Sequence, residues 1–234
     1  MCGEQSLQKV EGIIKGQNLI KVQVRELLIN KDYDRLVDLC EQDRHFWQAV
    51  RFCLYDIDES IRWPAIEAAA KLMKQWWQSK RQEKVREFIR NLFWSMNDES
   101  GGMGWSSPQT IAETIVNIPE IIDPYGSMMI AHSIEEPPLM KGGLWGIGRL
   151  GRMISDAVDF FQDKILIAFQ SDDAETLGLA AWAMGEVRSK PALPFLEKLL
   201  ERKEPVRIYV KSAFFEKPLG QWAEEAIDKI SKSS

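Results

Sequence analysis

The sequence contains few residues of the types that build metal centres and disulfide frameworks. Among 234 residues there are two histidines and three cysteines. The cysteines, Cys2, Cys40 and Cys53, show no CxxC spacing, so neither a cysteine-rich metal site nor a disulfide framework is expected. Two histidines, His45 and His132, exclude a histidine-rich metal site. We therefore expect no bound metal and no other cofactor.

The sequence also lacks long apolar runs and an excess of positive charge. No apolar run reaches the roughly 18 residues that a membrane-spanning helix needs. The first residues, MCGEQSLQ, lack the basic and then apolar segments of a secretion signal. Lys and Arg number 30 against 35 Asp and Glu, a net charge of −5, which is poorly suited to holding phosphate backbones over a wide surface. We expect a cytoplasmic protein that binds neither a membrane nor nucleic acid.

Helical periodicity is present along nearly the whole chain. Apolar residues recur at the i, i+3, i+4 spacing of an amphipathic helix. One such stripe consists of Val85, Phe88, Ile89, Leu92, Phe93 and Met96, and another of Leu219, Trp222, Ala223, Ala226, Ile227 and Ile230. Proline stands near three predicted helix starts, at Pro108, Pro124 and Pro191. Short polar turns between these segments indicate stacked helical hairpins, an all-α fold.

Two segments of the chain superimpose on each other. GLWGIGRL (143–150) and AAWAMGEV (180–187) align so that Trp145 matches Trp182 and Gly148 matches Gly185. Small residues at helical spacing allow a neighbouring helix to approach closely. The stretch IRWPAIEAAAKL (61–72) has a similar small-residue face. The pattern predicts repeated helical hairpins packed through these faces.

These segments resemble HEAT-like repeats of the bilin-lyase type. The shared signature is an acidic turn, a Val/Ile-Arg pair, an Ala-rich helix ending in Gly, and then A-x-P-x-L-x-x-L-L. Residues 58–72 match it with Ile61–Arg62, and residues 172–200 match it except that Leu177 replaces the Arg. The likeness is good over 143–201, fair over 56–96 and weak before residue 56. It implies a prokaryotic member whose fold is an α-solenoid, an α-α superhelix of stacked hairpins.

The resemblance implies one domain over residues 1–234. Residues 1–55 would form divergent N-terminal helices, 56–201 the repeats, and 202–234 a β-hairpin with a C-terminal capping helix. The hairpin is predicted near 206–217, because Val206, Ile208 and Val210 alternate with polar residues there. We expect it to be short and exposed.

Three other patterns favour structural roles over chemistry. Gly146, Gly148 and Gly151 spell G-x-G-x-x-G, but no strand precedes them, so close helix packing is the better interpretation. Cys40 and Cys53 lie on apolar stripes, which predicts buried, inert thiols. The basic and aromatic stretch 74–86 could hold an acidic partner, but a charged helix–helix turn with Trp76 or Trp77 buried is favoured.

The segment NDESGGMGWSSP (97–108) is the strongest candidate for a functional surface. It combines polar acceptors, three glycines and an aromatic side chain, a mixture typical of protein interfaces. The alternative is a long turn in which Trp105 packs inward. Arg62 and Arg149, near helix starts, could pair with its acidic residues, and Trp63 and Trp145 also lie beside turns. The predicted partner-binding surface comprises Arg62, Trp63, Asn97, Asp98, Glu99, Trp105, Trp145 and Arg149.

The architecture suggests a function class without naming a partner. Solenoids offer long surfaces for gripping other macromolecules. We therefore expect a cytoplasmic protein–protein interaction scaffold or adaptor that is not an enzyme, with an unidentified protein as its partner. The alternative is an enzyme on a HEAT-like scaffold, bilin-lyase-like or DNA-glycosylase-like, although no residue of this sequence stands out as catalytic. The oligomeric state stays open.

Overall fold

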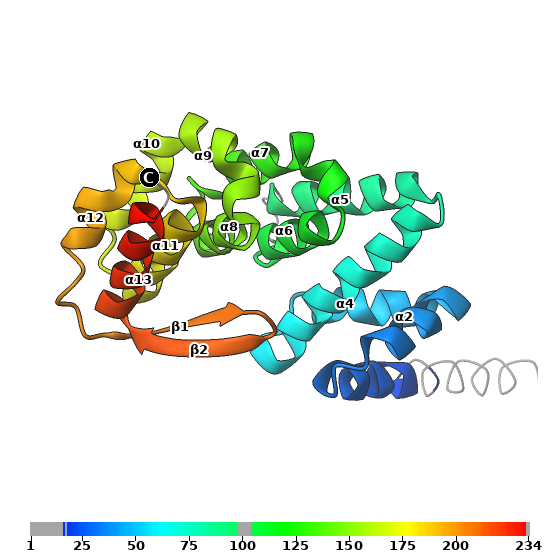
Figure 1. Cartoon of the computed structure of the whole chain (residues 1–234). Helices are drawn as coiled ribbons and strands as arrows, with labels where there is room; N and C mark the ends of the chain where they lie inside the picture. The colour runs from blue at the N-terminus through cyan, green and yellow to red at the C-terminus, as the bar shows by residue number, and fades with distance from the viewer. Residues whose placement is uncertain (1–15, 17, 98–103, 233–234) are drawn as a thin grey trace, which may run out of the picture. The chain divides into compact units, whose positions relative to one another are not determined.

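Figure 1 shows a computed structural model of the chain, which describes residues 16, 18–97 and 104–232. The described chain is predominantly α-helical with one small antiparallel sheet, as the periodicity predicts. It divides into two compact units, Met1–Gln75 and Trp76–Ser234, which we call unit 1 and unit 2. The single-domain organisation stays a prediction.

Unit 1 consists of amphipathic helices packed through apolar stripes. Residues 18–29 form a helix that is followed by α2 (Tyr33–Gln42), α3 (Arg44–Cys53) and the first part of α4 (Glu59–Gln78). The buried face of α2 consists of Tyr33, Leu36, Val37 and Cys40, all of which belong to one predicted stripe. Burial of these side chains removes apolar surface from water and is the main contribution to the stability of this unit.

Unit 2 contains the other described helices and both strands. Its helices are α5 (Gln82–Met96), α6 (Ser107–Asn117), α7 (Ile122–Ser133), α8 (Pro137–Leu150), α9 (Ser155–Phe160), α10 (Gln162–Leu166), α11 (Ala174–Val187), α12 (Leu193–Glu197) and α13 (Leu219–Ser231). Short 3-10 turns, η1 (Pro119–Ile121), η2 (Gly151–Ile154), η3 (Ile167–Gln170) and η4 (Lys190–Ala192), connect several of them. The predicted stripe of α5 is buried throughout.

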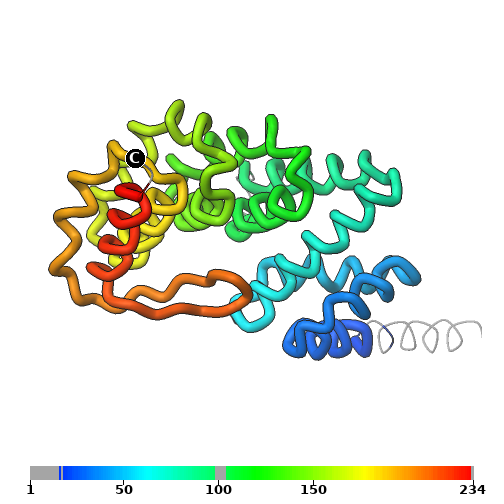
Figure 2. Tube along the Cα trace, in the orientation of Figure 1, coloured from blue at the N-terminus to red at the C-terminus, as the bar shows by residue number. Residues whose placement is uncertain are grey.

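The helices of unit 2 are arranged in two rows. Helices α6, α8, α11 and α13 pack against one another in that order. Helices α5, α7 and α12 lie against the first row, α7 between α6 and α8 and α12 on α13. The tube in Figure 2 follows the same course from the green helices to the red one. Helices that are close in the sequence therefore lie close together in unit 2.

Glycines allow close packing within the first row, as the aligned segments predict. A Cβ atom added at Gly148 on α8 would lie 2.5 Å from the Trp182 ring on α11. One added at Gly185 on α11 would lie 2.7 Å from the Cα of Ala226 on α13. The two aligned glycines thus make the same kind of contact, each with the next helix of the row. The indole rings of Trp145 and Trp182 are both buried, with centroids 6.4 Å apart.

The predicted β-hairpin is present, but its exposure was predicted wrongly for one strand. Strands β1 (Pro205–Val210) and β2 (Ala213–Pro218) pair antiparallel across Lys211 and Ser212. Both turn residues have positive φ, 50° and 63°, as two-residue hairpin turns require.

Half of strand β1 is buried, because it packs against helices of the first row. Val206 and Ile208 are buried, and a Cβ at Gly178 on α11 would lie 2.4 Å from Val206. The indole of Trp145 donates to the carbonyl oxygen of Tyr209 at 2.7 Å, and that of Trp222 to Val206 at 3.1 Å. These two bonds satisfy buried indole N–H groups, which would otherwise be costly to bury.

Candidate functional site

Two of the predicted surface residues lie at the start of α4 and are buried. Arg62 is 8% exposed and Trp63 is 6% exposed. The Arg62 guanidinium donates from Nη1 to the carbonyl oxygen of Asp56 at 3.1 Å and from Nη2 to Glu59 Oε1 at 2.9 Å. Their assignment to a partner-binding surface was therefore wrong. The arginine closes the acidic turn before α4, and the indole packs into the core of unit 1.

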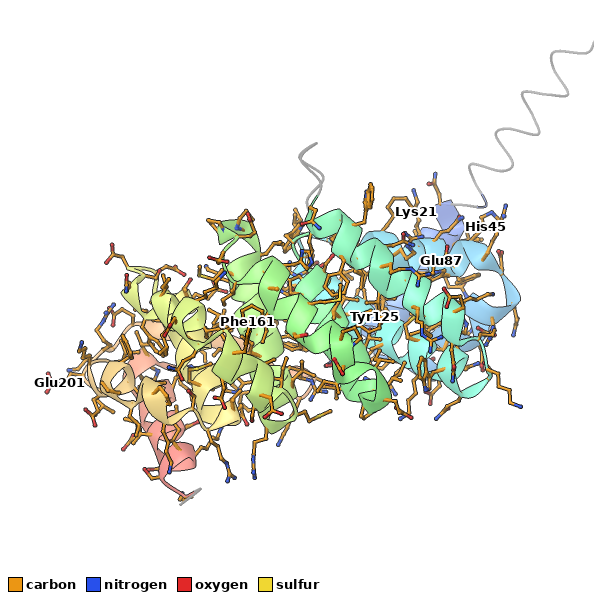
Figure 3. All side chains as sticks on the ribbon, turned by 90° about the horizontal axis from the view of Figure 1, so that it is seen from above. Lys21, His45, Glu87, Tyr125, Phe161 and Glu201 are labelled. Atoms are coloured by element: carbon orange, nitrogen blue, oxygen red, sulfur yellow. The ribbon has the colours of Figure 1, made fainter. Side chains whose placement is uncertain are left out.

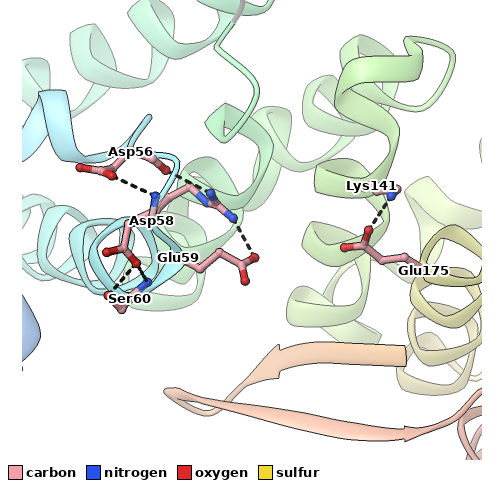
Figure 4. Close-up of polar contacts among 7 residues, drawn as sticks. Asp56, Asp58, Glu59, Ser60, Lys141 and Glu175 are labelled. Atoms are coloured by element: carbon pink, nitrogen blue, oxygen red, sulfur yellow. Dashed lines mark hydrogen bonds and ion pairs between the residues drawn. The ribbon is translucent and has the colours of Figure 1, made fainter. Parts of the chain in front are cut away.

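The acidic turn itself is a helix cap. Asp58 Oδ1 accepts hydrogen bonds from Ser60 Oγ at 2.7 Å and from Ser60 N at 2.9 Å (Figure 4). These bonds hold the pKa of the Asp58 carboxyl below its usual range. The turn is thus explained by helix initiation rather than by binding.

Trp145 and Arg149 lie on α8 and both have partners within unit 2. Trp145 is 4% exposed, so its assignment to a binding surface was also wrong. Arg149 is partly exposed and donates two hydrogen bonds to the Glu113 carboxylate on α6, from Nε at 2.6 Å and from Nη2 at 3.0 Å. The predicted alternative partners, Asp98 and Glu99, lie outside the described residues.

Glu113 is a residue that the sequence analysis missed. It is 8% exposed on the buried part of α6, and it joins α6 to α8 through Arg149. The sequence does place this carboxylate beside Ile111, Ala112 and Ile115, which are apolar and expected to be buried. A buried charge needs a partner of opposite charge, so this pattern could have predicted the ion pair. The pair links neighbouring helices of the first row.

The described ends of the 97–108 segment are held together. Gly104 N donates to the carbonyl oxygen of Ser95 at 2.9 Å, and the hydroxyls of Ser95 and Ser107 lie 3.0 Å apart. A Cβ at Gly104 would lie 2.2 Å from Ser95 Oγ and 2.5 Å from Ser107 Oγ, so a larger residue there would displace these hydroxyls. Asn97 is exposed and donates from Nδ2 to Phe93 O, while Trp105 is half-buried.

A second tryptophan lies beside this closure and is far more exposed. Trp94, at the end of α5, is 81% exposed, whereas its neighbour Phe93 is 6% exposed. The sequence analysis missed it, although it falls off the apolar stripe of α5, which predicts a solvent-facing side chain. We call Trp94, Asn97 and Trp105 the loop-closure site, since each lies within two residues of the Ser95–Gly104 bond.

Charged residues also connect α8 to α11, near the end of α8 that is opposite to Arg149. Lys141 Nζ lies 3.0 Å from Asp173 Oδ2 and 2.5 Å from Glu175 Oε2; Figure 4 shows the second contact. Asp173 also caps α11, since its Oδ2 accepts from Thr176 N at 2.9 Å. Partial desolvation raises the pKa of Asp173, but the Thr176 bonds and Lys141 together hold it below its usual range.

Replacing Asp173 by Ala is expected to lower the free energy of unfolding by about 1 kcal/mol, the usual effect of losing a cap. Because the pKa of Asp173 is lower in the folded state, its contribution is complete at neutral pH. It is lost as the pH falls below about 4, through the folded-state pKa. Urea denaturation at pH 7 and pH 3 measures both effects. The adjacent, exposed Asp172 is the matched control, and D172A should change stability by less than about 0.5 kcal/mol. Equal effects of the two variants would contradict the capping role.

The thiols and the basic turn have the structural roles that were expected. Burial raises the pKa of the Cys40 thiol to about 12 and that of Cys53 to about 11, so both remain protonated at neutral pH. Cys2 lies outside the described residues. Trp76 is buried with the charged groups of Arg81 and Lys84 near its ring, and Arg86 lies over Trp77.

Neither a metal cluster nor a membrane span occurs in the part of the chain that the structure describes. No group of three or more His, Cys, Asp or Glu side chains is placed there to hold an ion. Over the same residues, no helix combines the length and apolarity that crossing a membrane requires.

Unit 1 contains a cavity of about 250 Å³ between the helix at 18–29 and α3. Lys21 and His45 line it from opposite helices, and Figure 3 shows the two side chains close together. Phe52, 73% exposed, forms part of its rim, with Lys21 Nζ 6.0 Å from the ring centroid. The Nδ1 atom of His45 is hydrogen-bonded to Asp43 Oδ1 at a distance of 2.7 Å.

Comparison with known proteins gives a relative without a known activity. The chain is 27% identical to an uncharacterized protein of Archaeoglobus fulgidus over 160 residues, which covers 67% of this chain and 81% of the relative. No protein-family model matches the chain.

Proposed function

We propose that unit 2 is a protein-binding module built as an α-solenoid of HEAT-like hairpins. The ordered packing of α6, α8, α11 and α13 supports this architecture, as do the equivalent contacts of Gly148 and Gly185. Such a module in the cytoplasm would act as a scaffold or adaptor for another protein.

The exposure of Trp94 is the observation that carries the proposal. An indole 81% exposed leaves a large apolar surface in water, and tryptophan is among the residues that most often anchor protein interfaces. Trp94 precedes Ser95, whose carbonyl oxygen accepts the hydrogen bond from Gly104 N. This bond fixes the backbone of Trp94 at the end of α5. A fixed anchor loses little conformational entropy on binding.

The surroundings of Trp94 suit a protein partner better than a nucleic acid. The exposed face of α5 presents both signs of charge, with Arg90 paired to Glu83 at 2.6 Å and Glu87 exposed nearby. A mixed, partly neutralised rim around an aromatic centre is the composition of protein interfaces. Phosphate backbones would instead require unpaired cations.

Replacing Trp94 by Ala is expected to leave the melting temperature nearly unchanged, because the side chain is exposed, and to abolish partner capture. The measurement is affinity capture from an extract of the source organism, with mass spectrometry of the retained proteins. Phe160 on α9, 82% exposed, provides the matched control. F160A should retain the same partners as the unmodified protein. Full retention by W94A would contradict the proposal.

A further inference from the structure

A second cavity, of about 360 Å³, lies within unit 2. Residues of η2 and α9 line one side of it, and the turn after α11 lines the other. Its polar lining consists of Arg152, Ser155, Asp159, Arg188, Ser189 and Lys190. None of these residues belongs to the loop-closure site. The cavity therefore needs an explanation independent of the proposed protein-binding function.

Positive charge predominates in the lining. Arg152, Arg188 and Lys190 face a single carboxylate, Asp159, so the lining carries a formal charge of +2. Across the residues that the structure describes, none of these three cations lies within ion-pair distance of a carboxylate. Elsewhere in unit 2, Lys141, Lys164 and Arg202 all have such partners. The three cations of the cavity thus have no ion-pair partner of their own among the described residues.

The backbone of two turns brings these side chains together. Arg188 is the C-cap of α11 and adopts the left-handed conformation, with φ 64° and ψ 43°. Glycine usually occupies this position, because a side chain there is strained. The other turn begins at Gly151, after α8, with φ 54°. A Cβ atom added at Gly151 would lie 3.4 Å from the carbonyl oxygen of Glu186. Arg188 thus lines the cavity from a backbone conformation that is uncommon for residues other than glycine.

A buried hydroxyl adds a second indication. Ser189 is 5% exposed, and its Oγ has no hydrogen-bond partner among the described residues. Ser155 Oγ, by contrast, donates to Arg152 O at 3.0 Å. An unpaired buried hydroxyl costs roughly 1–3 kcal/mol, and this one belongs to a residue that lines the cavity.

We propose that this cavity binds a phosphate dianion, either free or as the phosphoryl group of a small monoester. A phosphate monoester carries roughly −1.5 to −2 at neutral pH, which matches the charge of the lining. Guanidinium groups bind phosphate oxygens in bidentate fashion, and two are available here. The volume lies near the lower end of the roughly 300–1,000 Å³ of small-molecule sites, which fits a small phosphorylated compound.

The test is a titration of the full chain followed by ¹⁵N NMR, with inorganic phosphate, ribose 5-phosphate and ribose as probes at constant ionic strength. The amides of Arg188 to Lys190 should shift saturably with phosphate or ribose 5-phosphate and not with ribose. Tighter binding of ribose 5-phosphate would assign a monoester, and binding of inorganic phosphate alone would assign free phosphate. Absence of a saturable shift with either phosphate compound would overturn the proposal.

Two variants separate binding from folding. R188G removes the guanidinium and relieves the strained φ, so the fold should persist while phosphate binds at least about tenfold more weakly. K190Q should also weaken binding about tenfold. K203Q, at an exposed lysine outside the cavity, should bind phosphate like the unmodified protein. If K203Q and K190Q weaken binding equally, the effect is general electrostatics and the site is excluded.

Discussion

Replacing Gly185 by Leu is expected to destabilise unit 2 by about 1–3 kcal/mol, the usual effect of overpacking a tight interface. The added side chain would start 2.7 Å from the Cα of Ala226, and backbone of α13 can move aside only by separating the two helices. Urea denaturation followed by tryptophan fluorescence measures the loss, since Trp182 lies on the same helix.

A smaller substitution at the same position and a substitution at a distant glycine serve as controls. Gly185→Ala should destabilise less than Gly185→Leu, because it adds one atom at the contact. Gly16 has no atom within 4 Å of an added Cβ, so G16A should not destabilise the protein. An unchanged urea midpoint for G185L would show that α11 and α13 do not pack closely at this point.

Replacing Arg149 by Ala is expected to cost about 2–3 kcal/mol. The substitution leaves the Glu113 carboxylate buried without its bidentate partner, and removing one member of a fully buried pair costs roughly 3–5 kcal/mol. The lower figure follows because the Arg149 side chain is 31% exposed, so water already screens part of the interaction.

A double-mutant cycle isolates the contribution of the pair. Glu113→Gln in the Arg149→Ala background removes the unpaired charge, so the double variant should be more stable than R149A alone. Stabilities are compared from urea midpoints at pH 7. Additive losses in the two single variants and the double variant would mean that the two side chains do not interact.

The sequence predicts the helices of this protein well because their apolar stripes are continuous. The stripe of α5 and the β-hairpin near 206–217 depend on neighbouring residues, and both are present. Val158, Phe161, Ile165, Ala168 and Phe169 also recur at helical spacing in the sequence, which predicts one helix. The backbone leaves helical geometry at Phe161, with φ −96° and ψ 12°, so the stretch is not a single helix. Periodicity does not detect such a local break.

Burial of the candidate site residues could not be predicted, because it depends on contacts between distant segments. Trp145 donates to Tyr209, which is 64 residues away, and Arg149 pairs with Glu113 at a separation of 36. Position beside a turn suggested exposure for both Trp63 and Trp145, yet tertiary packing covers them. The phosphate cavity likewise joins two turns that no motif connects.

The most direct test of the protein-binding proposal is photo-cross-linking from position 94. A photoreactive phenylalanine analogue replaces Trp94 in one variant and Phe160 in a control, and each is irradiated in the source cell. The proposal predicts a discrete covalent adduct with one protein from position 94 and no such adduct from position 160. No adduct from position 94, or the same set of adducts from both positions, would contradict it.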